Sequence, residues 1–574
     1  MSARFLISAI LVWSLAGGIS ASAQSDFLPA GELIGSTSTA ASTQSAASNE
    51  RFAPTPKEIA GIIERFTARE RGEQEAFSAF KPIIETYIQE ETLNAQMGTV
   101  PKSDFYFLGQ ADFRNRLKVH SLVEGTHTRS LIWSFNQAGF LQMIFPDRGE
   151  FDKDHYNFTY VKREFLGEVR CLVFDVDRAQ KARGPRFRGR IWVEDQDDTI
   201  VRFNGVIAPE IRFSVRQFAD EYYLHFDSWR LNSKAGLWVP AYVYSQNLDK
   251  PAPFGVPLYK SQTRIWGYGV TQVSHEEELN RLLIESPNEV KDEEAQHDRS
   301  PLEQQREWRR EAANNVFDVL ERDGLVARKG DVEKTLNTIV NNLIVSNNLE
   351  NQVDLNCRVL MTSNLEMFSM QDTVVVSRGL IDVVPNEETL AALLAYEVAD
   401  AMVPKPAEDQ YGFSDILRLK PTEVMKRLSF ADNKTEAVQI SEKAIEIFKK
   451  SPYAGKAESA GLFFSQLQWG SKNLRQLISP RLGNRVFFTS ELLHAAPALQ
   501  MGNMWQIAAL PMGSRIKVNP WNDSITMMKT QPMAPISPRE KMPFEVTPII
   551  PYLTRYTATA AAEHGSKMAI AKNQ

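Results

Sequence analysis

The chain has 574 residues, of which 43% are hydrophobic, and this length is enough for two to four globular domains. Its formal net charge is −6, and no basic stretch interleaved with aromatic residues stands out, so a nucleic-acid partner is not expected. The two cysteines, Cys171 and Cys357, have flanks typical of strand interiors. Two buried free thiols are therefore expected rather than a disulfide framework.

Residues 1–23 have the parts of a secretory signal peptide. The short positive stretch MSAR precedes the apolar run FLISAILVWSLAGGI, and small residues at Ala21 and Ala23 predict cleavage near Ala23. The apolar run is too short for a membrane span, and no later run of about 18 or more apolar residues follows it. We therefore expect a mature chain without a transmembrane segment, in the periplasm or secreted.

The mature chain is predicted to begin with a linker, a helix and a β domain. Residues 24–54 are rich in Ser, Ala and Thr and favour a disordered linker. Residues 55–275 form the first predicted domain, which opens on a helix over 56–80. That helix would carry an apolar face made of Ile59, Ile62, Ile63 and Phe66.

From about residue 82 the apolar period changes to two, which is typical of strands. Three hairpins are predicted from local turns, at residues 130–145, 186–205 and 221–246. Several strands in series with local turns indicate an antiparallel meander, curved into a half-barrel or a sandwich. The alternating residues of the second hairpin are Phe187, Ile191 and Val193 on one face and Arg188, Arg190 and Trp192 on the other.

The second half of the chain has a mainly helical pattern with a small sheet. Residues 276–300 are charge-rich and are predicted to be a linker, residues 301–500 a domain, and residues 501–574 a Pro- and Met-rich extension that could wrap earlier domains. Ser300 caps a helix that should end near Gly324. LNCRVLMTS and DTVVVSRGL read as strands, and the fold class is thus multidomain α+β.

The stretch LAALLAYEVADAMV, residues 390–403, predicts a buried helix that contains Tyr396-Glu397-x-x-Asp400. Zinc peptidases carry His-Glu-x-x-His at this spacing, because two histidines on one helix face bind the metal while the glutamate activates water. Here Glu397 keeps the position of the base. Tyr396, a phenol with an ordinary pKa of about 10, and Asp400 stand at the ligand positions.

The histidines argue against zinc in this half. The chain has 8 histidines, only His494 falls between residues 326 and 500, and no two are spaced i, i+4. We therefore expect no metal and no cofactor. A carboxylate site for Ca²⁺ or Mg²⁺ made of Glu397, Asp400 and Glu436 is an alternative, since hard cations prefer oxygen ligands.

The segment QDTVVVSRGLIDVVPNEETLAALLAYEVADAMV resembles the HtpX- and BepA-like zinc metallopeptidase family, which includes the CAAX-type peptidases. The shared features are Gly379-Leu380 after a strand, the acidic helix start at residues 386–388, the run 390–395, and then Glu397 and Ala399. The resemblance covers roughly residues 300–490 and departs from the family at Tyr396 and Asp400. It implies a third ligand position near Glu436 or, in another register, at Ser441, with no aspartate kept behind either.

The phrases YNFTYVKREFLGEVRCLVFDVDR, RIWVEDQDDTIVRFNG and AGLWVPAYVYSQ resemble the LolA/LolB-like outer-membrane lipoprotein carriers. This resemblance implies a half-barrel whose concave apolar sheet holds acyl chains. Large aromatic residues could line such a pocket or simply fill the core of a sandwich. The candidates are Trp133, Trp192, Phe226, Trp229 and Trp238.

Two acidic stretches are not expected to bind a metal ion. Asp195, Asp197 and Asp198 lack the glycine and the closing glutamate of a Ca²⁺ loop, so a solvated hairpin turn is favoured. His275 before three glutamates is typical of a surface charge run.

These patterns favour an exported envelope protein without catalytic activity. It would join a metallopeptidase-like scaffold to a domain that binds a lipid, a lipoprotein or an unfolded envelope protein. A peptide client could add to a strand edge near residues 373–378. The alternatives are an active metalloendopeptidase with an atypical zinc site and a purely structural envelope protein.

Overall fold

The structure is a computed structural model that describes most of the chain from Pro54 to Tyr556. All described residues belong to the second of two units, Pro54–Gln574; the first is Met1–Ala53. The predicted signal peptide 1–23, the linker up to Ala53, the linker 276–300 and most of the predicted hairpin 130–145 lie outside the described residues. The described ranges are 54–94, 98–113, 118–123, 143–145, 147, 149–208, 225–247, 258–268, 301–403, 434–479, 496–500, 503–511, 516–518, 525–527 and 544–556.

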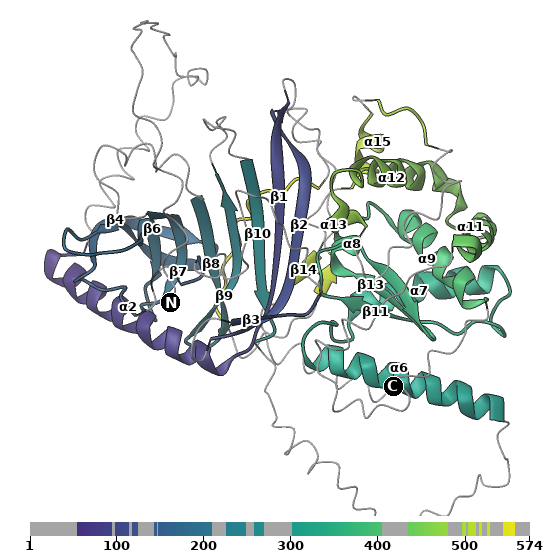
Figure 1. The fold of residues 1–574 in the computed structure, drawn as a ribbon, viewed down its shortest axis with the longest axis horizontal. Helices are drawn as coiled ribbons and strands as arrows, with labels where there is room; N and C mark the ends of the chain where they lie inside the picture. The colour runs from purple at the N-terminus through teal and green to yellow at the C-terminus, as the bar shows by residue number, and fades with distance from the viewer. Residues whose placement is uncertain are drawn as a thin grey trace, which may run out of the picture. The chain divides into compact units, whose positions relative to one another are not determined.

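The first half of the described chain forms one ten-stranded sheet in which all neighbours are antiparallel (Figure 1). The strands from β4 to β10 follow one another as a meander, and β1 joins the far side of β10. Among the described strands, β3 and β4 have a neighbour on one side only, so the sheet is open. The strands are β1 (Ile83–Asn94), β2 (Gly98–Asp112), β3 (Lys118–Ser121), β4 (Tyr156–Leu166), β5 (Val169–Arg178), β6 (Arg186–Glu194), β7 (Ile200–Ala208), β8 (His225–Lys234), β9 (Leu237–Gln246) and β10 (Leu258–Trp266).

This sheet confirms the predicted antiparallel half-barrel class, together with the hairpins β6–β7 and β8–β9. Side chains on β5 alternate between two buried clusters, with Cys171 and Val173 in one and Leu172 and Phe174 in the other. Because successive strand residues point to opposite sides, the two clusters mark the two faces of the sheet. We call them the α2 face, which contains Phe174, and the opposite face, which contains Val173.

Helix α2 (Pro56–Ala76) covers the α2 face. It begins with a capping box, in which the Thr55 backbone N–H donates to the Glu58 carboxylate at 2.7 Å and the Thr55 hydroxyl accepts from the Glu58 backbone N–H at 3.4 Å. Ile62, Ile63 and Phe66 are buried against the sheet, as the spacing predicted. The helix ends at Ala76 and continues as a short 3-10 turn.

The second half is mainly helical around a three-stranded sheet, which confirms the predicted class of this part. The predicted apolar stripe of the second helix is buried in α7. The elements are α6 (Pro301–Arg322), α7 (Asp331–Ser346), β11 (Asn356–Leu360), β12 (Met367–Met370), β13 (Thr373–Ser377), α8 (Arg378–Val383), α9 (Glu387–Ala401), α11 (Lys434–Lys449), α12 (Ala457–Gly470), α13 (Arg475–Ile478) and α15 (Met504–Ala508). A separate hairpin joins β14 (Ile516–Val518) to β15 (Ile525–Met527). None of the described helices is long and apolar enough to cross a membrane.

The predicted peptide-binding edge near residues 373–378 is wrong. Strand β13 is the middle strand of the small sheet, with β11 parallel on one side and β12 antiparallel on the other. Its backbone N–H and C=O groups are therefore used on both sides, and no edge is left for an added strand.

The C-terminal extension returns to the large sheet. Residues 544–556 cross its opposite face, beginning at β1, where the Gln89 side-chain amide donates to the Phe544 carbonyl at 2.6 Å and accepts from Val546 N–H at 2.7 Å. Farther on, the Glu168 backbone N–H donates to the Leu553 carbonyl at 2.9 Å, and Arg555 pairs with Glu194. Residues 544–556 of the extension thus contact the first half of the chain.

Candidate functional site

The α2 face is lined with phenylalanines, most of which are fully or almost fully buried. Phe66, carried by α2, contacts the rings of Phe158 and Phe174 at centroid distances of 5.2 and 5.4 Å. These edge and tilted geometries are those that aromatic pairs prefer. The other buried rings of this face include Phe77, Phe151, Phe187, Phe203 and Phe226. The result is an apolar surface against which α2 packs, together with residues 143–145 and Phe151.

A buried ion-pair cluster anchors α2 to the sheet. Arg230 of β8 donates to Glu70 at 2.7 Å through both of its terminal nitrogens, and one of these also donates to Glu73 at 2.9 Å. The three side chains are between 1% and 4% exposed. The guanidinium carbon also lies 5.1 Å from the Phe145 ring centroid and 5.2 Å from that of Phe203. We call Arg230, Glu70 and Glu73 the latch.

The latch holds two carboxylates against one buried cation, and the pKa of one carboxyl group is raised. Arg69, whose side chain is 39% exposed, is a second partner of Glu73 at 3.2 Å. Burial raises the pKa of Glu73 to about 7, and the nearby Glu70 carboxylate acts in the same direction. Arg230 and a 2.9 Å hydrogen bond from the Thr199 hydroxyl oppose the shift without cancelling it. Near neutral pH, Glu73 therefore exists in both protonation states.

Exposed ion pairs hold the helix at its flanks. Arg65 pairs with Asp198 through two hydrogen bonds of 2.6 and 3.2 Å, and Lys153 pairs with Glu64 at 2.7 Å. The Arg65 side chain is 58% exposed and that of Lys153 is 43% exposed, so water screens both contacts. These pairs are peripheral contacts of α2, in contrast to the buried latch.

The acidic turn between β6 and β7 is more closely packed than the predicted solvated turn. Asp195 pairs with Arg170, Asp197 accepts a 3.2 Å hydrogen bond from the Trp238 indole, and Asp198 pairs with Arg65. The three carboxylates are held by separate donors.

The aromatic candidates within the described residues are divided between the two faces of the sheet. Of the candidates within the described residues, only Phe226 belongs to the α2 face, while Trp192, Trp229 and Trp238 belong to the opposite face. Trp133 lies outside the described residues. Phe187 stood in the predicted alternation with Ile191 and Val193, whereas Phe174 was not among the candidates.

The helix with the peptidase-like spacing, α9, lies in the core of the second half. Asn386 caps it by accepting from the Thr389 backbone N–H at 2.9 Å, and every residue from 389 to 400 is buried. Tyr396 and Glu397 are fully buried, and Asp400 accepts a hydrogen bond of 2.9 Å from the Ser369 hydroxyl.

The residues of α9 do not fit a zinc site. A phenol and a carboxylate already bonded to a serine stand where two imidazoles would be needed. Glu436 lies in the first turn of α11, and its side chain is outside the described residues. Within the described ranges, no three His, Cys, Asp or Glu side chains are grouped so that they could hold a metal ion. Cys357 is a buried free thiol, as is Cys171, which confirms that prediction.

No family model matches the chain, and no curated protein matches it at a significant level. Two solved structures are similar to part of it. A LolA superfamily protein from Nitrosomonas europaea is 10% identical over 37% of this chain and 92% of its own, with a TM-score of 0.19. A DUF1329 family protein from Desulfovibrio piger is 9% identical over 38% of this chain and 99% of its own, with a TM-score of 0.18. Both likenesses are too low to indicate a ligand or an activity of this chain.

Proposed function

We propose that the protein binds a long apolar ligand, an acyl chain or the acylated end of a lipoprotein, on the α2 face, with α2 as a displaceable cover. The observation that carries the proposal is a broad phenylalanine surface covered by α2, with Phe145 and Phe151 of the segment before β4 packed beside the helix. An apolar chain that replaced α2 would gain about 25 cal/mol for each Å² of apolar surface removed from water. In this structure α2 covers the α2 face, so a ligand can bind there only after α2 has moved away.

The way α2 is attached supports this role. Its outer contacts, Arg65–Asp198 and Lys153–Glu64, are exposed ion pairs that water screens, so they oppose its departure only weakly. The buried latch is the contact that has to open before the helix can leave. The helix is also terminal in the described chain, since it begins at Pro56, and its departure breaks no strand pairing. An exported location after cleavage near Ala23 is part of the same proposal.

The first test weakens the cover without touching the phenylalanines. In the double variant Arg65→Ala/Lys153→Ala, both exposed ion pairs are lost, so the open form becomes more populated and apparent affinity rises. We expect a fluorescent fatty acid to bind roughly two- to fivefold more tightly than to the natural sequence. Lys443→Ala, which removes a similar exposed pair within α11, is the matched control and should change nothing.

A purely structural role gives a different result. A filled core is also what a structural envelope protein needs, and such a protein would bind no fatty acid in any of the three forms. Absence of binding in the natural sequence and in the double variant would therefore exclude the carrier proposal and favour the structural alternative.

We further propose that the second half is a pseudopeptidase scaffold. The replacement of both ligand positions, the full burial of Glu397 and the Asp400–Ser369 hydrogen bond support this reading. Elemental analysis of the purified chain should find no stoichiometric zinc. Stoichiometric zinc, together with casein cleavage that is lost in Glu397→Ala, would establish the metalloendopeptidase alternative instead.

A further inference from the structure

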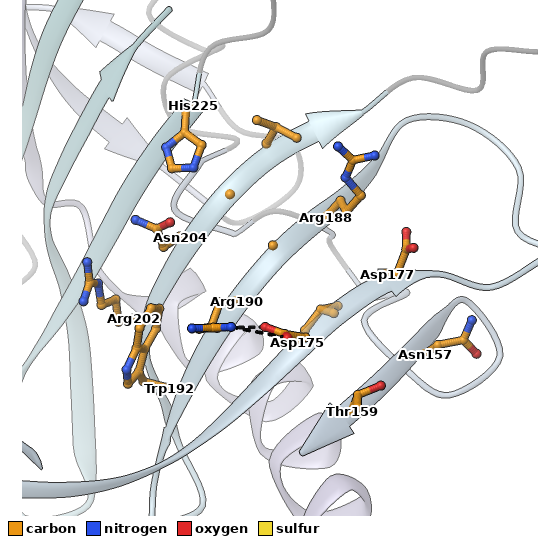
Figure 2. A pocket seen from close by; sticks show the side chains of 14 residues that line it. Asn157, Thr159, Asp175, Asp177, Arg188, Arg190, Trp192, Arg202, Asn204 and His225 are labelled. Carbon is orange, nitrogen blue, oxygen red and sulfur yellow. Dashed lines mark hydrogen bonds and ion pairs between the residues drawn. The ribbon is translucent and has the colours of Figure 1, made fainter. Parts of the chain in front are cut away.

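A polar groove of about 690 Å³ lies on the opposite face of the large sheet (Figure 2). Five neighbouring strands line it, each with at least one polar side chain. These side chains include Asn157 of β4, Asp175 of β5, Arg190 of β6, Asn204 of β7 and His225 of β8. The volume is within the range of small-molecule sites, but the lining is far more polar than that of an acyl-chain pocket.

The groove is separate from the site proposed above. Asp175 and Arg190 alternate along their strands with Phe174 and Ile191, which point to the α2 face. The C-terminal segment contacts the other end of β6, where Arg555 pairs with Glu194. A ligand in the groove would therefore compete neither with α2 nor with these contacts of the extension.

Two of the arginines that line the groove are paired with carboxylates. Arg190 binds Asp175 through two hydrogen bonds of 2.7 and 3.3 Å, and Arg202 binds Asp227 through two of 2.7 and 2.8 Å. Because these guanidinium groups already hold carboxylates, an incoming anion would have to displace an internal partner. The pairing thus disfavours a strongly anionic ligand.

The same pairing fixes the positions of donors and acceptors. The Arg202 guanidinium carbon lies 4.2 Å from the Trp192 ring centroid and 4.3 Å from that of Trp229, so its plane is held between two indoles. Arg190 and Asp175 keep side-chain exposures of 40% and 52%, which leaves N–H and oxygen sites open to the groove. A ligand therefore contacts N–H donors and oxygen acceptors whose side chains are already ordered, so binding loses less conformational entropy.

Backbone forms the centre of the groove. Gly189 and Gly205 are opposite each other in the β6–β7 register and both line the groove. A Cβ on Gly189 would meet the Asn204 carbonyl oxygen at 2.2 Å, and a Cβ on Gly205 would meet the Arg188 carbonyl oxygen at 2.2 Å. The two strands therefore approach in a way that only glycine allows.

We propose that this groove binds an uncharged polyhydroxylated ligand, a saccharide chain. Each sugar hydroxyl both donates and accepts hydrogen bonds, which fits a surface where amides, a hydroxyl and internally paired Arg–Asp groups alternate. An acyl chain would leave these polar groups without partners, and a phosphate would compete with Asp175 and Asp227.

Calorimetric titration of the full chain with maltohexaose, cellohexaose and chitotetraose tests the proposal. We expect at least one of these neutral saccharides to bind with a Kd of about 1 mM or lower. The double variant Asp175→Ala/Arg190→Ala removes the exposed pair as a unit and leaves no lone charge. It should weaken that binding by about tenfold or more. Arg310→Ala/Asp372→Ala removes a comparable exposed pair elsewhere and should leave affinity unchanged.

Circular dichroism of each variant shows whether the sheet is retained, so that a loss of binding is assigned to the groove. Three results would overturn the proposal. The first is that none of the three saccharides binds, and the second is that a saccharide binds equally well to the Asp175→Ala/Arg190→Ala variant. The third is that inorganic phosphate binds while the neutral saccharides do not, which would make the groove an anion site.

Discussion

Gly379→Ala is expected to lower the free energy of unfolding by about 3 kcal/mol or more, or to prevent the second half of the chain from folding. A Cβ at this position would lie 1.9 Å from the Ser363 carbonyl oxygen and 2.4 Å from its carbonyl carbon. Because both of these atoms belong to the Ser363 backbone, they cannot move aside as the end of a flexible side chain could. The Gly379 N–H also donates to the Thr362 carbonyl at 3.0 Å, so separating the two segments would break a buried hydrogen bond.

Ser363 cannot retreat, because the large sheet holds it. Its backbone N–H and its hydroxyl each donate to the Glu85 carboxylate of β1 at 2.6 Å. Glu85 is buried, and burial raises its pKa, while the bonds from Ser363 and a 2.8 Å bond from the Tyr106 hydroxyl favour the charged form. The Gly379 contact thus bears on the junction between the large sheet and the helical half.

Urea unfolding followed by circular dichroism measures the effect, with Gly455→Ala as the matched control. Nothing lies within 4 Å of a Cβ at Gly455, so this variant should change the free energy of unfolding by less than about 0.5 kcal/mol. Equal midpoints for Gly379→Ala and the natural sequence would show that the close approach to Ser363 is absent in solution.

Local patterns explain which parts of this fold could be predicted. The hairpins β6–β7 and β8–β9 are joined by short turns, so the two-residue period of each strand was enough to pair them. The helices α2 and α9 carry their own caps, at Thr55 and Asn386, and their boundaries could be read from those residues.

Simple alternation accounts for the faces of these strands. In β6, Phe187, Ile191 and Val193 lie on the α2 face and Trp192 lies on the opposite face, as the two-residue period predicted. In β8, the same alternation puts Arg230 on the α2 face and Trp229 on the opposite face. The β6–β7 and β8–β9 pairings contain register shifts as well, and a count along the sequence does not show where such a bulge falls.

Long-range contacts explain the rest. Arg230 and Glu70 form a hydrogen bond although they are 160 positions apart in the sequence. Neither residue belongs to a sequence motif from which its partner could be predicted. The polar groove was missed for the same reason, since Arg190 and Asp175 acquire a common surface only when β5 and β6 pair. The position of β13 between two short strands likewise depends on pairing, which the apolar run of residues 373–377 does not specify.

Arg230→Met is expected to cost about 3–5 kcal/mol of the free energy of unfolding. The substitution keeps much of the apolar volume but leaves the Glu70 and Glu73 carboxylates buried without their shared cation. Adding Glu70→Gln and Glu73→Gln to Arg230→Met should restore part of the loss, because no buried charge then remains. Arg190→Met, in a pair that is about half exposed, is the control and should change stability by less than about 1 kcal/mol.

The pH dependence gives the latch a second readout, with a sign fixed by Glu73. Its pKa is about 7 in the folded protein against an ordinary 4.5, so the folded chain binds more protons than the unfolded chain between these values. The stability from this group is complete below about pH 4.5 and is lost as pH rises through about 7, by roughly 3 kcal/mol at most. Glu73→Gln should therefore flatten the decline in urea midpoint between pH 5 and pH 8. If the urea midpoint of this variant fell as steeply with pH as that of the natural sequence, the buried Glu70–Glu73 pair would not be the contact that holds α2 on the sheet. Another contact would then have to stabilise the position of this helix.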